Sequence, residues 1–293
     1  MRGLAIGAGV LAGLAGLALA GVWLASSQRL TRAIAAPDTP VAAAAATPGT
    51  LARGRHRATS IMKCSDCHGD DFGGKVVIDD PALGVVSAPN LTRGAGGVGA
   101  RLTAAVLERS VRHGLGEGDR PLVLMPSDDY QRLTDADQAA LSAYLLSLPP
   151  VDRTVRPTAL GPMGRALLVA GQLPVLSAER IAHERVGRAT VAEGDTLALG
   201  TYLADIGGCT GCHRADLTGG PIPGTPPDWK PAANISASGP SHGWTEAQFV
   251  RAMRSGVRPD GTPIDTLMPW RLAGQMTDAE LHAVWRFLQA PRG

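Results

Sequence analysis

The stretch CSDCH at residues 64–68 returns as CTGCH at residues 209–213, so the chain carries one five-residue pattern twice. Each copy places two cysteines three positions apart and follows the second directly with a histidine. These two pairs contain all four cysteines of the 293-residue chain. Because none is left over and the chain is long for a disulfide-rich scaffold, a network of disulfides is not expected.

The pattern belongs to a longer internal repeat. Its offset can be followed at three pairs of matching residues: His68 and His213, 145 positions apart, Asn90 and Asn234, 144 apart, and Met125 and Met268, 143 apart. Each copy has the same expected order of a helix, the cysteine pair, a second helix, a loop that ends in Leu-Met-Pro, and a closing helix. The expected helices lie at about 51–61, 103–112 and 134–148 in the first copy and at about 193–206, 245–254 and 277–288 in the second.

The closing helices have the clearest local signals. Thr134 and Thr277 are suited to cap their first turns, and Glu280 stands three residues after Thr277, in the position of a capping box. Leucines and aromatic residues then recur at intervals of three and four, which is typical of a helix that buries one face. The sequence therefore predicts two repeated domains with the following bounds: 1–34 signal anchor, 35–50 Ala/Pro-rich tether, 51–150 first domain, 151–190 linker, and 191–293 second domain.

The N-terminal segment from Gly3 to Ala25 contains no charged side chain over 23 residues, which is long enough to span a bilayer as a helix. A cleaved signal peptide is the alternative, since Ala18-Leu19-Ala20 offers a small-x-small cleavage site. Cleavage there would leave an apolar new terminus, so we expect an uncleaved transmembrane anchor. Gly9 and Gly13 form a GxxxG pair that could contact a partner helix, which would make the chain a subunit of a complex.

Cys-x-x-Cys-His is the attachment motif of c-type haem. The two thiols, Cys64 and Cys67 in one copy and Cys209 and Cys212 in the other, bond covalently to the porphyrin, and the next residue, His68 or His213, lies under the iron. A zinc site built from both pairs, or a redox dithiol, would leave the histidine after each pair unexplained. We therefore expect two covalently bound haem c groups, and we expect the haem-bearing part on the periplasmic side of a bacterial inner membrane.

Methionine is the usual partner of histidine on the iron of a cytochrome c, and it raises the reduction potential. The chain has seven methionines, and Met125 and Met268 alone match in both copies as the centre of Leu-Met-Pro. The predicted metal ligands are therefore His68 and Met125 for one haem and His213 and Met268 for the other. Ordinary core methionines are the alternative for both positions.

Both copies resemble class I cytochrome c domains. Residues 234–236 (NIS), 243–249 (GWTEAQF), 255–261 (SGVRPDG) and 267–270 (LMPW) are similar to the cytochrome c subunits of membrane-bound alcohol and gluconate dehydrogenases. The resemblance implies an all-α fold of two tandem class I cytochrome c domains behind a transmembrane helix. It also implies that Asn90 and Asn234 line the haem edges, and that each first helix crosses the last at a glycine: Gly54 beside Tyr144, and Gly200 beside Phe287. Those subunits carry three haems, whereas this chain has two motifs.

Two functions fit these features. The first is electron transfer between a donor, such as a dehydrogenase or a quinol-linked complex, and an acceptor, such as an oxidase or a soluble cytochrome of a respiratory chain. The second is a dihaem enzyme, such as a peroxidase, which needs one open haem site. Because both copies keep the Met-Pro loop, we expect an electron carrier that catalyses no substrate reaction of its own. The formal net charge of +2 gives no reason to expect nucleic-acid binding.

Overall fold

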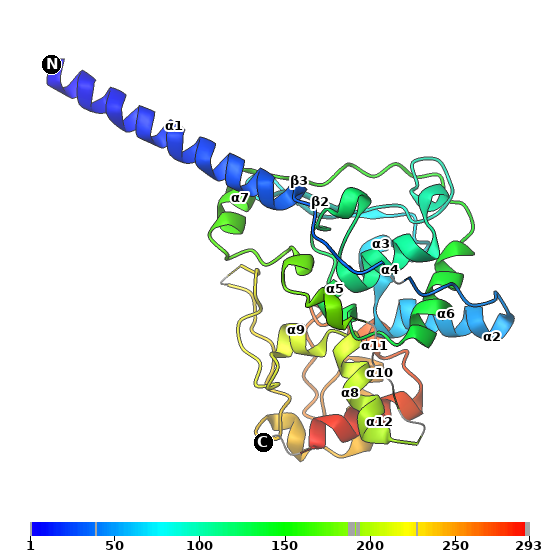
Figure 1. The fold of residues 1–293 in the computed structure, drawn as a ribbon. Coiled ribbons are helices and arrows are strands. Elements are labelled where there is room, and N and C mark those ends of the chain that lie inside the picture. Colours follow the sequence, from blue (N-terminus) through cyan, green and yellow to red (C-terminus); the bar gives the residue numbers. More distant parts are fainter. Residues whose placement is uncertain (1, 39, 187–190, 192–193, 227, 291–293) are drawn as a thin grey trace.

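The computed structural model describes the chain apart from residues 1, 39, 187–190, 192–193, 227 and 291–293. A long helix, α1 (Arg2–Thr31), projects from one end, the first domain follows at its base, and the second domain lies at the far end from the tip of α1 (Figure 1). One segment of α1, Gly9–Thr31, is long and apolar enough to cross a membrane.

The first domain is built from short helices and a small sheet. Its helices are α2 (Pro48–His56), the π-helical turn η1 (Arg57–Ile61), α3 (Cys64–His68), α4 (Ala104–His113), α5 (Ser127–Tyr130) and α6 (Asp135–Leu146). The linker to the second domain adds α7 (Pro162–Val169). The predicted helix at 51–61 is thus divided into an α-helix and a π-turn, and Thr134 caps α6 by accepting a bond from the Asp137 amide.

The second domain repeats this order. Its helices are α8 (Thr196–Ile206), α9 (Cys209–His213), α10 (Glu246–Ser255), α11 (Trp270–Ala273) and α12 (Asp278–Gln289). Asp195 caps α8, and the predicted start of this helix at Glu193 lies outside the described residues. Thr277 and Glu280 form the predicted capping box of α12.

The first and last helices of each domain cross at a glycine, as the resemblance implied. A Cβ at Gly54 would lie 2.1 Å from the Ala140 carbonyl oxygen of α6, and one at Gly200 would lie 2.0 Å from the Ala283 carbonyl oxygen of α12. A side chain of any size would force the helices apart, so hydrogen as the side chain sets this close approach.

A three-stranded antiparallel sheet accompanies the first domain, so the fold is mostly helical rather than purely so. Its strands are β1 (Lys75–Asp80), β2 (Gly84–Ala88) and β3 (Ala159–Leu160), in that order across the sheet. The third strand comes from the linker, and Gly84 pairs with Leu160 where the backbones approach closely. Short runs of Val and Ile explain why β1 and β2 form here.

One hydrophobic core runs through both domains. It joins buried side chains of the first domain, such as Ile61 and Leu141, to buried side chains of the second, such as Ile206 and Leu281. A smaller cluster lies beneath the linker and contains Val86, Leu160, Leu168, Val175 and Leu176. The two repeated domains are therefore packed against each other as one unit.

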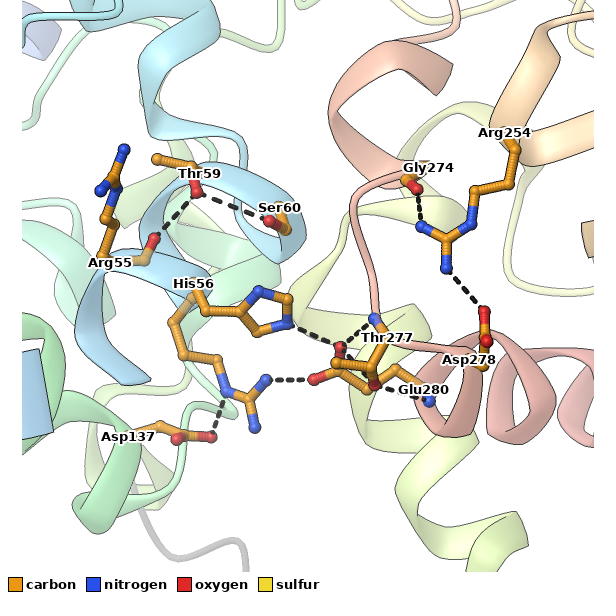
Figure 2. A network of polar contacts seen from close by, with 11 residues as sticks. Arg55, His56, Thr59, Ser60, Asp137, Arg254, Gly274, Thr277, Asp278 and Glu280 are labelled. Carbon is orange, nitrogen blue, oxygen red and sulfur yellow. Dashed lines mark hydrogen bonds and ion pairs between the residues drawn. The ribbon is translucent and has the colours of Figure 1, made fainter. Parts of the chain in front are cut away.

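Buried polar contacts also cross the domain boundary. Asp137 accepts a 2.6 Å hydrogen bond from the Tyr202 hydroxyl of the second domain. Arg57 lies 3.0 Å from Asp137 and 2.7 Å from Glu280 of α12. Figure 2 shows His56 and Glu280 directed toward each other, with 2.6 Å between His56 Nε2 and Glu280 Oε2. Although burial acts to raise the pKa of Glu280, the bonds from His56, Thr277 and Arg57 lower this pKa to about 2.

The segment predicted as a tether, residues 35–50, lies against the first domain. The Val41 amide donates to the Glu108 carboxylate at 2.8 Å, and the Ala44 amide donates to the Ala139 carbonyl at 3.1 Å. Composition alone gave no sign of these contacts. The base of α1 and the first domain are consequently held together along this segment.

Candidate haem-attachment sites

Each Cys-x-x-Cys-His motif forms one short helix, α3 or α9. The residue before each helix has a left-handed backbone, Lys63 at φ 54° and Gly208 at φ 66°, so the chain turns sharply into the motif. None of the four cysteines forms a disulfide. All of their thiols are therefore available for covalent attachment.

The histidine of each motif is oriented by a backbone carbonyl. His68 Nδ1 lies 2.9 Å from the Pro89 oxygen, and His213 Nδ1 lies 2.8 Å from the Ala233 oxygen. A hydrogen bond at Nδ1 fixes the tautomer and leaves Nε2 with its lone pair free for a metal. Burial lowers the pKa of both imidazoles, which favours the neutral form that binds iron.

Burial also affects the thiols. It raises the pKa of Cys64 to about 12 and raises the pKa of Cys67, Cys209 and Cys212 above the usual value. Unattached thiols in this environment stay protonated rather than acting as thiolate ligands. Within the described part of the chain, no three His, Cys, Asp or Glu side chains gather as a metal site, so the four cysteines do not assemble the zinc site considered above.

The two predicted methionines lie in matching loops, just before α5 and α11. Met125 and Met268 are both partly buried against the core that spans the two domains, and so are Cys64 and Cys209. The structure thus brings a methionine and an attachment cysteine of each repeat to the same apolar interior. An apolar interior of this kind suits the faces of a porphyrin and the thioether of a methionine ligand.

The two predicted asparagines hold the loops that orient the histidines. Asn90 is 1% exposed, accepts bonds from the Thr92 amide and hydroxyl, and donates to the Val151 carbonyl at 2.7 Å. Asn234 accepts matching bonds from the amide and hydroxyl of Ser236. Each asparagine directly follows the residue whose carbonyl binds the histidine. Their visible role is therefore in the loop, and contact with a haem edge stays a prediction.

Lys63 is a feature of the site that the sequence reasoning missed. Its ammonium donates to the Ile61 carbonyl at 2.8 Å and to the Gly207 carbonyl of the second domain. Burial lowers the pKa of Lys63, while the nearby Cys209 thiol and Asp129 carboxylate act in the opposite direction. The pKa of Asp129 is itself raised to about 7 by burial and by Asp128. The sequence signal was the presence of lysine where the second copy has Gly208.

The fold and these sites define a two-domain c-type cytochrome, with one covalent haem site in each domain. A family model for cytochrome c matches residues 52–149 and again residues 191–290. The chain belongs to the cytochrome c family, and it carries two covalently bound haem c groups.

Relatives named for electron transfer share much of the chain. It is 27% identical to a subunit of the nicotinate dehydrogenase of Pseudomonas putida over 85% of its length, and 29% identical to the fructose dehydrogenase cytochrome subunit of Gluconobacter japonicus over 78%. The chain spans 21% and 46% of the length of these two proteins. It is also 27% identical to a diheme cytochrome c-type protein of Cereibacter sphaeroides, over 77% of this chain and 81% of that protein.

Proposed function

We propose that this chain is a membrane-anchored dihaem cytochrome c that passes electrons from a dehydrogenase or a quinol-linked complex to an oxidase or a soluble cytochrome. The observation that carries the proposal is the joining of the two attachment sites. Lys63 of the first domain binds the Gly207 carbonyl of the second, directly before the two motifs, and one core lies behind both. Two haem sites held in this way suit transfer between haems within one chain.

The residues of each domain have separate tasks in this proposal. Cys64 and Cys67, and likewise Cys209 and Cys212, hold the haem covalently, and the haem supplies one-electron chemistry. His68 and His213 are the proximal ligands, and the carbonyl bonds at Nδ1 make Nε2 the ligating nitrogen. Met125 and Met268 are the opposite ligands. A methionine on each iron leaves no position for a substrate, so the chain acts as a carrier.

We place the haem domains on the periplasmic side of the bacterial inner membrane, with α1 as the anchor. Residues Gly9–Thr31 of this helix are long and apolar enough to cross a bilayer. Two relatives are named as dehydrogenase subunits, which supports a role as the electron-accepting subunit of a dehydrogenase complex. The Gly9 and Gly13 pair of α1 is the surface proposed for a partner helix.

Carbon monoxide binding to the dithionite-reduced full chain in detergent tests the ligand assignment. We expect mass spectrometry to show two haems per chain and the absorption spectrum to stay unchanged under carbon monoxide, because both irons are fully ligated. Met125→Ala and Met268→Ala should each open one haem to the ligand. Stoichiometric binding to the parent chain would instead indicate an open site and would favour the peroxidase alternative.

A further inference from the structure

The last turns of α1 pack closely against α7, the short helix of the linker. The Arg165 guanidinium lies 3.7 Å from the centroid of the Trp23 ring, and it donates to the hydroxyls of Ser26 and Ser27 at 2.9 and 3.0 Å. Arg29 pairs with Glu179, which lies just beyond α7 in the linker. These contacts fix the position of α7 along the axis of α1, beside the segment from Trp23 to Arg29.

This segment falls at the membrane surface if α1 is the anchor, so the inference rests on the proposed function. A hydrocarbon core about 30 Å thick takes about 20 residues of helix. Residues 3–23 carry no charged side chain and fill that length, which puts Trp23 at the interface, where tryptophan is enriched. Ser26 and Arg29 then lie in the headgroup region. Because α7 packs at this level, it also lies beside the bilayer surface.

The outward side of α7 is apolar. Its exposed residues combine with an exposed turn between β1 and β2, to which α7 is bonded through the Met163 amide and the Ala82 carbonyl at 3.1 Å. We call this surface the α7 face; it consists of Pro81, Ala82, Pro162, Met163, Ala166 and Val169. Met163 is 51% exposed and Val169 is 38% exposed. The α7 face lies beside the exposed apolar residues Trp23 and Leu24 of α1.

The inward side of α7 is already occupied by the protein. Leu168 is fully buried in the small core with Leu160 and Leu176, and Gly164 lies against the Leu83 backbone. A helix that is apolar on both sides normally has apolar surroundings on both sides. Protein supplies them on one side of α7, and the lipid that surrounds α1 is the nearest apolar material on the other.

We propose that the α7 face rests on the lipid surface around the point where α1 enters the bilayer. The membrane then holds the first domain by two contacts, one spanning and one interfacial. The first domain lies next to the bilayer, and the second domain lies away from it, at the far end of the molecule from the tip of α1 (Figure 1).

The test uses single-cysteine variants of the full chain in nanodiscs of phosphatidylethanolamine and phosphatidylglycerol. The native cysteines are bonded to haem and do not react with maleimides. Val169→Cys probes the α7 face, and Val257→Cys is the matched control, an exposed valine of the second domain at 44% exposure. Leu14→Cys reports whether α1 lies in the bilayer. Each variant is labelled with a charged and with an uncharged maleimide, and the ratio of the two rates removes differences in intrinsic thiol reactivity.

We expect the charged-to-uncharged ratio at residue 169 to be at least tenfold below that at residue 257. Equal ratios at these two residues, with residue 14 protected from the charged reagent, would overturn this inference and leave the membrane anchor intact. A residue 14 that reacts with the charged reagent as fast as residue 257 would overturn the anchor and this inference together. Unchanged absorption spectra of both haems serve as the folding control for each variant.

Discussion

The crossing of α2 and α6 at Gly54 offers a sharp test of how the first domain is packed. In Gly54→Ala the new methyl carbon would lie 2.1 Å from the Ala140 carbonyl oxygen and 2.7 Å from Tyr144 Cβ. Ordinary contacts begin near 3.4 Å, so the two helices must separate by more than ~1 Å. Both nearest groups belong to the backbone or to a Cβ, which cannot turn aside as the end of a long side chain could.

The magnitude follows from two opposing effects. Overpacking of this kind costs about 3 kcal/mol, and the better helix propensity of alanine offsets about 1 kcal/mol, which leaves a net loss of about 2 kcal/mol. Because the two domains share one core, they should unfold together as a unit of more than 200 residues. For a unit of that size, 2 kcal/mol corresponds to a decrease in Tm of about 4–8 °C.

The same helix supplies the control. Gly49 also lies in α2, and a Cβ there would meet nothing within 4 Å. Calorimetry of the oxidised holoprotein should show the Tm of Gly49→Ala within about 2 °C of the parent, since only helix propensity changes. If Gly54→Ala melted within the same 2 °C, the close crossing of α2 and α6 and the reasoning built on it would be wrong.

Three further perturbations test the site and the domain boundary. Lys63→Met should lower the reduction potentials by about 70 mV, the effect of one charge at roughly 10 Å with an effective dielectric constant near 20; unchanged values in a potentiometric titration would exclude an electrostatic role. Ser177→Ala removes the 2.7 Å bond to the Met125 carbonyl. Guanidinium should then break the Met125–iron bond at a lower concentration, by about 1 kcal/mol, without affecting Met268, as followed in the methionine-to-iron absorption band. Glu280 has a lowered folded-state pKa, so its contribution to stability is complete above about pH 4.5 and is lost toward pH 2. Glu280→Gln should flatten the urea stability profile across that window, and an unchanged slope would contradict this.

Local signals in the sequence carried much of the fold. The repeated Cys-x-x-Cys-His motif, the capping threonines Thr134 and Thr277, and the periodic apolar residues of the closing helices each act within one or two turns of chain. The structure confirms these caps and helices. The glycine crossings at Gly54 and Gly200 came from resemblance, because no local pattern tells which glycine meets another helix.

The features that the sequence did not reveal all depend on distant partners. Strand β3 comes from the linker and pairs with β2 about 75 residues earlier, which no short-range periodicity can indicate. Residues 35–50 have the composition of a flexible tether, yet single amide bonds such as that from Val41 to Glu108 attach them to the first domain. Lys63 gained its position only when the second domain brought Gly207 beside it.

The linker also makes two similar domains unequal. The Leu124 amide binds the Val175 carbonyl at 2.7 Å, and Ser177 binds the carbonyl of Met125, so the linker covers the methionine loop of the first domain. The corresponding Leu267 of the second domain is 41% exposed. A loop held from outside loses fewer conformations when its methionine binds the iron, whereas the open loop leaves its domain accessible to a protein from solution. The same segment that fastens α1 to the first domain thus leaves the second domain as the side that faces a soluble partner.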